Sequence, residues 1–439
     1  MKTPICDFVK EYSASPKVRA HMPGHKGIGD IEHYDITEIA GADSLYEAQG
    51  IIAQSEQNAG ALFGADTFFS TEGSSLAIRA MLYLAVMYAK SKGQKPLILA
   101  ARGVHRSFVS AAALIDFEVE WFYPQNQESY LSCKIDLEEL ERQIQEQRPT
   151  AVYITSPDYL GNIQDIKGIS RVCQKNDALL LVDNAHGAYL KFLKDSVHPM
   201  DLGADMCADS AHKTLPVLTG GAYLHVSKAA PRFFKENAKT AMSLFGSTSP
   251  SYVILQSLDR ANVYLETHKR RLAGFLPRLN ALKGNLTDLG YTLEGDEPLK
   301  ITVRTKPYGY TGDEFARILV QHDVMYEFCD PDYVVLMLTQ ENSGDMEKIL
   351  TAFEKIKKRA PIKLAPPRLS KPEKATDIRQ AVMDGAQLVP VEKSLGRIAA
   401  AVTVGCPPAV PITVSGEVIS QSAIECFKYY SIEKILVKK

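Results

Sequence analysis

The 439-residue chain lacks any long hydrophobic run. No stretch approaches the roughly 20 uncharged apolar residues of a membrane-spanning helix, and residues 1–7 contain no apolar signal core. We therefore expect a soluble protein of the cytoplasm that has no membrane partner.

An excess of charge of one sign is also missing, because 50 Lys and Arg residues face 52 Asp and Glu residues. No block of like charge and no basic stripe with interleaved aromatic residues occurs, so nucleic acid is not an expected partner. The seven cysteines, including Cys406, are scattered and form no Cys-x-x-Cys pair. This pattern predicts free thiols in a reducing compartment.

Three common motifs are absent as well. The sequence has no Gly-x-Gly-x-x-Gly for a dinucleotide, no Gly-x-x-x-x-Gly-Lys-Ser/Thr for a nucleoside triphosphate and no His-Glu-x-x-His for zinc. His21, His25 and His186 could in principle bind a metal, but their spacing fits no common metal motif. We therefore expect no metal site.

What the sequence does contain is a long alternation of apolar strand-like runs and helical patterns. Strands are expected at Thr67–Ser70, Leu97–Ala100, Val119–Tyr123, Ala151–Thr155, Leu179–Val182 and Gly221–Val226, and helices at Gln49–Phe63, about 74–84, Ser107–Ile115, Leu137–Gln147, Ile166–Lys175 and Tyr252 to about Leu272. Apolar strands bracketed by helices predict an α/β fold with a mostly parallel sheet covered on both faces.

The length of the chain predicts more than one domain. We expect an amino-terminal arm over 1–33, a large domain over 34–265 and a small α+β domain over 266–360. A Pro-rich stretch over 360–372 reads as a linker, and a helix is expected over about Lys374–Met383 in a last domain over 361–439.

Polar clusters follow several of the expected strands. They are Thr71–Ser75, Arg102–Ser107, Ser156–Asn162, Asp183–His186 and Ser210–Lys213. Because ligands of such sheets bind at the carboxyl ends of the strands, we expect these clusters to meet at one edge.

Two of these clusters carry the residues that a pyridoxal phosphate enzyme needs. The Lys213 amine could form an imine with the cofactor aldehyde, and a buried Asp183 could pair with the pyridine nitrogen and keep it protonated. Their separation of 30 residues allows one crossover between neighbouring strands. The alternative for Asp183 is that it caps the turn after its strand.

A phosphate site is expected where a helix begins at Gly73-Ser74-Ser75. Free backbone N–H groups, two hydroxyls and a glycine would hold a dianion, although an ordinary serine N-cap explains the same residues. His105 could stack on the cofactor ring or relay a proton, and it could equally cap a helix or lie on the surface.

Taken together, these motifs resemble the ornithine/lysine/arginine decarboxylase family over nearly the whole chain. The residues that carry the resemblance are His21–Gly27, Asp35–Glu38, Gly41–Asp43, Phe63–Asp66, Ser156–Gly161, Asp183–Ala188, Ser210–Lys213, Ser247–Tyr252, Pro407–Pro411 and Gly416–Glu417. The last two motifs extend the resemblance to the family's C-terminal domain, here 361–439.

The resemblance implies the fold of aspartate aminotransferase, which is fold type I of the pyridoxal phosphate enzymes. The residues it assigns to the cofactor are Lys213 as the imine-forming lysine, Asp183 at the pyridine nitrogen, His105 and Ala185 on the two faces of the ring, His186 beside it, and Gly73, Ser74, Ser75, Ser210 and His212 at the phosphate. Ser247 would reach the cofactor phosphate of a second subunit, so the resemblance implies at least a homodimer.

The activity implied is decarboxylation of lysine, arginine or ornithine to an amine that feeds polyamine biosynthesis, with Asp183, Lys213 and His105 as catalytic residues. Either His105 or Lys213 would protonate the product carbon. A non-catalytic relative that serves as a regulator or binding partner is the alternative. Because a mere binder needs no electron sink, Lys213 and Asp183 favour catalysis.

The chain departs from the family pattern in three places. Glu72 stands where an Asn is usual beside the phosphate loop, Asn184 replaces a common Glu, and we expect no N-terminal wing domain of the large enteric-type enzymes. Since an acid near a phosphate is repelled, we expect Glu72 to turn away from it or to meet a cationic substrate tail.

Overall fold

In the computed structural model, the chain forms two units that interleave along the sequence. Unit 1 comprises Met1–Leu99, Leu137–Ser156 and Asp165–Arg270, and unit 2 comprises Ala100–Asp136, Pro157–Gln164 and Arg271–Lys439. The structure describes residues 1–124, 129–402 and 408–439, so Cys406 and Pro407 lie outside the described residues.

A seven-stranded sheet is the centre of the fold, with strand order β1-β7-β6-β5-β4-β2-β3. The strands are β1 (Asp66–Ser70), β2 (Leu97–Ala101), β3 (Glu118–Phe122), β4 (Ala151–Thr155), β5 (Leu179–Asp183), β6 (Met206–Asp209) and β7 (Ala222–Val226). β4, β5 and β6 pair in parallel, whereas β7 is antiparallel to both β6 and β1. The predicted α/β fold with a mostly parallel sheet is confirmed.

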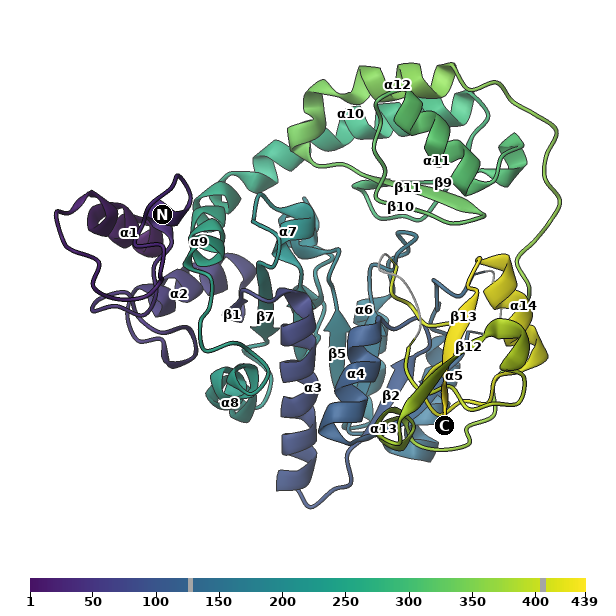
Figure 1. Ribbon diagram of the computed structural model, residues 1–439, viewed down its shortest axis with the longest axis horizontal. Helices are drawn as coiled ribbons and strands as arrows, with labels where there is room; N and C mark the ends of the chain where they lie inside the picture. The colour runs from purple at the N-terminus through teal and green to yellow at the C-terminus, as the bar shows by residue number, and fades with distance from the viewer. Residues whose placement is uncertain (125–128, 403–407) are drawn as a thin grey trace. The chain divides into compact units, whose positions relative to one another are not determined.

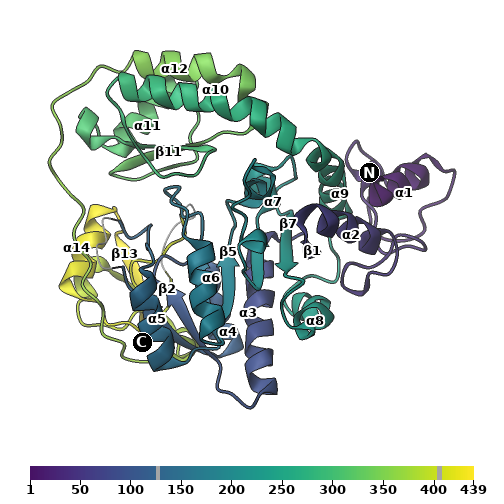
Figure 2. The same cartoon turned by 180° about the vertical axis from the view of Figure 1, so that it is seen from behind.

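The helices of unit 1 pack on this sheet or on one another. They are α1 (Pro4–Ala14), α2 (Ile51–Phe63), α3 (Gly73–Ser91), α5 (Leu137–Gln147), α6 (Ile166–Lys175), α7 (Ala211–Thr214), α8 (Arg232–Ser243) and α9 (Tyr252–Glu266), with short 3-10 turns at Glu32–Tyr34, Leu45–Glu47, Ala188–Phe192 and Pro199–Asp201. α3 packs on β5, β6 and β7, and α6 packs on β5 (Figures 1 and 2). α1, α2 and α9 pack together beside β1 (Figure 1). The central strands β4, β5, β6 and β7 are almost completely buried, which explains their largely apolar sequences.

Unit 2 contains a smaller antiparallel sheet of order β10-β11-β9-β8 and a two-stranded ribbon, β12-β13. Its remaining elements are α4 (Arg106–Ile115), β8 (Thr292–Glu294), β9 (Lys300–Arg304), α11 (Gly312–Gln321), β10 (Phe328–Cys329), β11 (Tyr333–Met337), α12 (Met346–Glu354), α13 (Ile378–Met383), β12 (Ala386–Pro390), α14 (Gln421–Tyr429) and β13 (Lys434–Lys438), with 3-10 turns at Lys306–Tyr308, Gln340–Gly344 and Val391–Lys393. α10 (His268–Asp288) joins the two units in sequence.

A buried ion pair within unit 2 gives the predicted Gly416-Glu417 motif a structural role. The Arg102 guanidinium lies 3.1 Å from a Glu417 carboxylate oxygen and donates to the carbonyls of Pro411 and Ile412. Because two buried charges are satisfied only together, this contact fixes the loop after β2 to residues 411–417.

Two predicted helix boundaries are wrong. The helix expected from Tyr252 to about Leu272 ends at Glu266, and a new helix begins at His268. The Thr267 hydroxyl and N–H both bond back to the Tyr264 carbonyl, and such local bonds compete with helix continuation. The helix expected from Lys374 begins only at Ile378, because the Asp377 side chain accepts the Gln380 N–H and caps it there.

Six cysteines lie among the described residues, and all six are free thiols, as predicted for them. Within the described part of the chain, no helix combines the length and the apolar character that crossing a membrane requires.

Candidate active site

Four strands of unit 1 end at one edge of the large sheet. β1, β4, β5 and β6 share one direction, and β7 runs against them, so β7 begins where the other four end. The polar clusters after β1, β5 and β6 therefore meet at this edge, as the sequence predicted for ligand sites of parallel sheets.

Lys213 lies in the one-turn helix α7, which follows β6 directly. Its Nζ atom is 2.8 Å from Nε2 of His186, which belongs to the turn after β5. Two residues 27 positions apart in the sequence thus share one hydrogen bond at the sheet edge. Lys213 is half-buried and is therefore not a fully solvated lysine.

Asp183 is the last residue of β5 and is only 2% exposed. Its carboxylate accepts hydrogen bonds from the Tyr153 hydroxyl at 3.3 Å and from the Ala185 N–H at 3.2 Å. Burial nevertheless raises the pKa of Asp183 to about 6, although the Lys213 ammonium and the two hydrogen bonds lower it and Asp209 raises it further. Such a carboxylate gains most from a cationic partner.

The start of α3 lies beside the start of α7. The Ser210 hydroxyl donates to the Ser74 hydroxyl at 2.8 Å, so the two predicted phosphate segments are in contact. Gly73 has φ +71°, and a Cβ atom there would meet nothing within 4 Å. Ser74 and Ser75 lie in the first turn of α3, where the positive end of the helix dipole favours an anion.

His212 is the last of the five residues that the sequence assigned to the phosphate. Its N–H donates to the Gly221 carbonyl at 3.2 Å, and its ring Nδ1 lies 3.0 Å from the same oxygen. These bonds hold α7 against the beginning of β7. The bond from Nδ1 to the Gly221 carbonyl also fixes the orientation of the His212 ring.

These residues fit pyridoxal phosphate. A phosphate dianion suits the N-terminal turn of α3 with its serine hydroxyls, and a protonated pyridine nitrogen suits the buried Asp183 carboxylate. Lys213 and Asp183 lie close enough for the ammonium to lower the pKa of the carboxylate. The buried Ala185 follows in the same turn, where a small side chain leaves room for a ring.

Glu72, the residue before α3, contacts the loop that contains Ser247. Its carboxylate accepts the Ser247 N–H at 2.6 Å, and its side chain is exposed. Glu72 thereby anchors the loop that contains the Ser247–Tyr252 motif. The predicted role of Ser247 toward a second subunit is not tested by this contact.

His105 belongs to unit 2 and caps α4. Its Nδ1 accepts the Ser107 N–H at 3.2 Å and lies 2.8 Å from the Ser107 hydroxyl. The helix-capping alternative is therefore observed. Stacking of this ring on the cofactor stays a prediction.

Four buried residues in contact with Asp183 or Asp209 were not predicted from the sequence. Tyr153 reads as core in an apolar strand, yet its hydroxyl reaches Asp183. Asp209 accepts hydrogen bonds from His198 and His225, and all three are completely buried. Asp209 directly precedes Ser210 at a strand end, which is the one signal that could have identified it.

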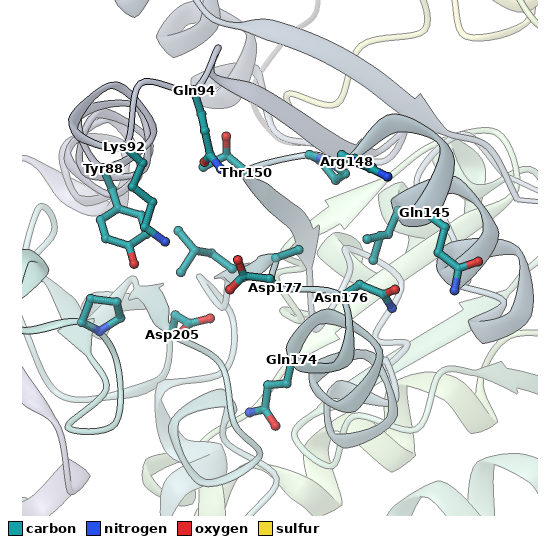
Figure 3. Close-up of a pocket in the computed structure, with 15 residues that line it drawn as sticks. Tyr88, Lys92, Gln94, Gln145, Arg148, Thr150, Gln174, Asn176, Asp177 and Asp205 are labelled. Atoms are coloured by element: carbon teal, nitrogen blue, oxygen red, sulfur yellow. The ribbon is translucent and has the colours of Figure 1, made fainter.

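A cavity of about 670 Å³ lies at the opposite edge of the sheet (Figure 3). It is lined by the ends of α3, α5 and α6, with Lys92, Arg148, Asp177 and Asp205 among its charged residues. Because it opens where β4 and β5 begin, this cavity is separate from Asp183 and Lys213, which lie at the other ends of the strands.

The fold and these residues place the protein in the class of fold type I pyridoxal phosphate enzymes. The model of the Orn/Lys/Arg decarboxylase major domain matches residues 3–302, and the model of the C-terminal domain matches residues 354–437. The chain therefore belongs to the Orn/Lys/Arg decarboxylase family.

Individual proteins agree with this assignment. An arginine decarboxylase from Halalkalibacterium halodurans is 29% identical over 96% of this chain and 92% of its own length. An arginine decarboxylase from Bacillus subtilis is 28% identical, with 96% and 92% covered. The crystal structure of a Francisella novicida lysine decarboxylase superposes with a TM-score of 0.81 at 17% identity, covering all of this chain and 81% of that one. At this low sequence identity, the structural similarity is evidence for a shared fold alone.

Proposed function

We propose that the protein is a pyridoxal phosphate-dependent decarboxylase of a basic amino acid and that arginine is its first candidate substrate. The observation that carries the proposal is the meeting of Lys213 with His186 and the buried Asp183 at the carboxyl edge of the sheet. The names of the two full-length relatives support arginine over lysine and ornithine.

Each residue has a separate task in this proposal. Asp183 binds the pyridine nitrogen, while Ser74, Ser75, Ser210 and His212 hold the phosphate at the start of α3. When bound, pyridoxal phosphate supplies a protonated ring that accepts the electron pair released as carbon dioxide leaves. Burial of Asp183 excludes water from its carboxylate, which strengthens the pairing with the ring nitrogen.

Lys213 has two tasks, because it both attaches the cofactor and lies where a proton is needed. Its amine is hydrogen-bonded to His186, so the imidazole can hold or return a proton at Nζ. We propose Lys213 as the group that delivers the proton to the product carbon. His105 is the second candidate for this step and would act from a stacked position on the ring.

The proposal extends to assembly and biological role. We propose a homodimer as the minimum assembly, with Ser247 reaching the cofactor phosphate of the second subunit, a cytoplasmic location, and an amine product that serves polyamine biosynthesis. The substrate is a small cationic amino acid. The domain limits 1–33, 34–265, 266–360 and 361–439 likewise remain our proposal.

A direct test measures carbon dioxide release from arginine, lysine and ornithine by the purified protein with pyridoxal phosphate. We expect one substrate, arginine, to dominate. Lys213→Ala should reduce kcat by at least about a thousandfold, because both the attachment and the proton step are lost. Lys235→Ala is the matched control, since Lys235 forms an exposed ion pair with Asp66 far from these residues.

Borohydride treatment followed by peptide mass analysis locates the cofactor in the same samples. The adduct should lie on Lys213 in the wild-type chain and in the Lys235→Ala control. An adduct on another lysine contradicts the assignment of Lys213. A wild-type protein that carries the adduct but releases no carbon dioxide from any of the three substrates supports the non-catalytic relative instead.

A further inference from the structure

Behind the proposed cofactor site lies a buried polar cluster that the proposed function does not use. Its centre is Asp209, the last residue of β6, whose side chain is completely buried. One carboxylate oxygen accepts hydrogen bonds from Nε2 of His198 at 2.9 Å and Nε2 of His225 at 3.2 Å. The other oxygen accepts the side-chain N–H of Asn184 at 2.7 Å.

The other ring nitrogens show how the two histidines are oriented. Nδ1 of His198 accepts the Met200 N–H, which places the ring proton on Nε2. Nδ1 of His225 lies 2.8 Å from the Thr67 hydroxyl, which can donate to it. Three N–H donors thus converge on one carboxylate. Although burial raises the pKa of Asp209, His198 and His225 together hold it below its ordinary value.

Asn184 connects this cluster to the proposed site. It directly follows Asp183, and its N–H donates to the Ala208 carbonyl at 3.0 Å, next to Asp209. The Asn184 carbonyl accepts the Gly187 N–H at 2.7 Å and so closes the turn over residues 184–187. The side chain and backbone of Asn184 therefore fix the turn that carries Asp183, Ala185 and His186.

The tight packing of this turn makes its geometry sensitive to Asn184. A Cβ atom at Gly187 would collide with the Asn184 side-chain oxygen. That oxygen is buried and has no hydrogen-bond partner within the described part of the chain, so the amide acts through its donor alone. A donor at position 184 requires an acceptor at 209, and the family's common Glu at 184 would instead face Asp209 with a second negative charge.

We propose that Asp209 is a positioning residue for the cofactor site, whose buried carboxylate, oriented by His198 and His225, holds the Asn184 amide and thereby the turn that presents Asp183 and His186. This role rests on the proposed function, because it acts through the cofactor residues. A bound metal is the competing explanation, since atoms of His198, Cys207 and Asp209 lie within 4.8 Å of one another. The ring protons aimed at Asp209 favour hydrogen bonding over a metal.

The test compares Asp209→Asn, Asn184→Asp and the double variant N184D/D209N as full-length proteins. Asp209→Asn places two amides face to face, and Asn184→Asp places two carboxylates face to face. We expect each single change to weaken the affinity for pyridoxal phosphate by about ten- to a hundredfold. The double variant restores one donor and one acceptor, so it should recover at least part of this loss.

Asp205→Asn is the matched control. Asp205 precedes β6 at its other end, where its carboxylate accepts the Leu180 N–H at 2.8 Å. The same charge change there should lower the thermal midpoint without changing the dissociation constant of the cofactor. If Asp209→Asn behaves like Asp205→Asn, with a lower midpoint and an unchanged dissociation constant, Asp209 is merely structural and the proposal is wrong.

Two further measurements separate the explanations. Side-chain N–H resonances of His198 and His225 in the protein without cofactor should be protected from exchange in the wild type and exposed in Asp209→Asn. One equivalent of zinc in the purified wild type, with loss of stability on chelation, would overturn the hydrogen-bonding role. A wild type that binds no pyridoxal phosphate rejects the proposed function, whereas the histidine resonances still report whether the cluster exists.

Discussion

The buried carboxylate of Asp183 lacks a fully compensating charge in the protein without cofactor. A carboxylate at the end of an apolar strand is costly to bury, and the hydrogen bonds from Tyr153 and Ala185 do not offset this cost. Its raised pKa means that the protein without cofactor holds this group partly protonated near pH 6. A pyridinium nitrogen would reverse that shift.

The pH dependence of stability tests this interpretation. Because the folded pKa of Asp183 is raised from 3.8 to about 6, its protonated form favours folding below pH 4, and this contribution is lost as the pH rises through 6. Relative to Asp183→Asn, the wild type without cofactor should lose roughly 2 kcal/mol of unfolding free energy between pH 4 and 7. Urea unfolding at several pH values measures this difference. Parallel pH curves for the two proteins would contradict it.

At the junction of β1, α3 and β7, two glycines with positive φ can be compared directly. The Gly73 N–H donates to the Gly220 carbonyl at 2.7 Å, and both glycines have positive φ, +71° and +98°. A Cβ atom at Gly73 would meet open space, whereas one at Gly220 would lie 2.8 Å from the Thr71 carbonyl oxygen. The two positions therefore share backbone strain but differ in steric clash.

Alanine substitutions separate these two effects. Gly73→Ala should cost about 1–2 kcal/mol of unfolding free energy from the left-handed backbone alone. Gly220→Ala should cost more, because the clash is with backbone that cannot rotate away. Urea unfolding with and without pyridoxal phosphate provides the measurement. Equal losses in the two variants would contradict a steric clash at Gly220.

For the chain as an assembled enzyme, the proposed homodimer makes a distinct prediction. If Ser247 serves the second subunit, then Lys213→Ala and Ser247→Asp subunits are each inactive alone, the second because a carboxylate repels the phosphate. A hybrid dimer contains one intact site, formed by Lys213 of one subunit and Ser247 of the other. Refolding the two variants together in equal amounts should restore about a quarter of wild-type activity, since half of the dimers are hybrids.

Activity assays on the refolded mixture decide this point, and each variant refolded by itself is the control. No recovery in a mixture that sedimentation shows to be dimeric would place Ser247 in its own subunit's site. A Ser247→Asp variant that is active when refolded by itself would place Ser247 outside any site. A monomeric protein with full activity would contradict the proposed assembly altogether.

Strong local patterns explain why several elements were predicted at their observed limits. α5, β4 and α6 agree residue for residue, because the amphipathic periodicity of the two helices and the strand-forming residues of β4 leave little competition. The break at Thr267 was missed, since a single side-chain bond to the Tyr264 carbonyl decides it. The start of α13 was missed for a similar reason at Asp377.

The order of motifs along the chain was enough to identify the decarboxylase family, to place Lys213 and Asp183 after neighbouring strands, and to predict an α/β sheet, because covalent order and hydrophobic pattern carry that information. The contacts that orient the site came from folding alone. Asn184 stood out in the sequence only as a departure from the family pattern, and His198, Asp209 and His225 did not stand out at all. These four residues become a network because folding brings residues up to 41 positions apart into one buried interior. In this interior, hydrogen bonds are strong and unpaired polar groups are costly. Burial therefore decides which of these residues contribute to the geometry of the site.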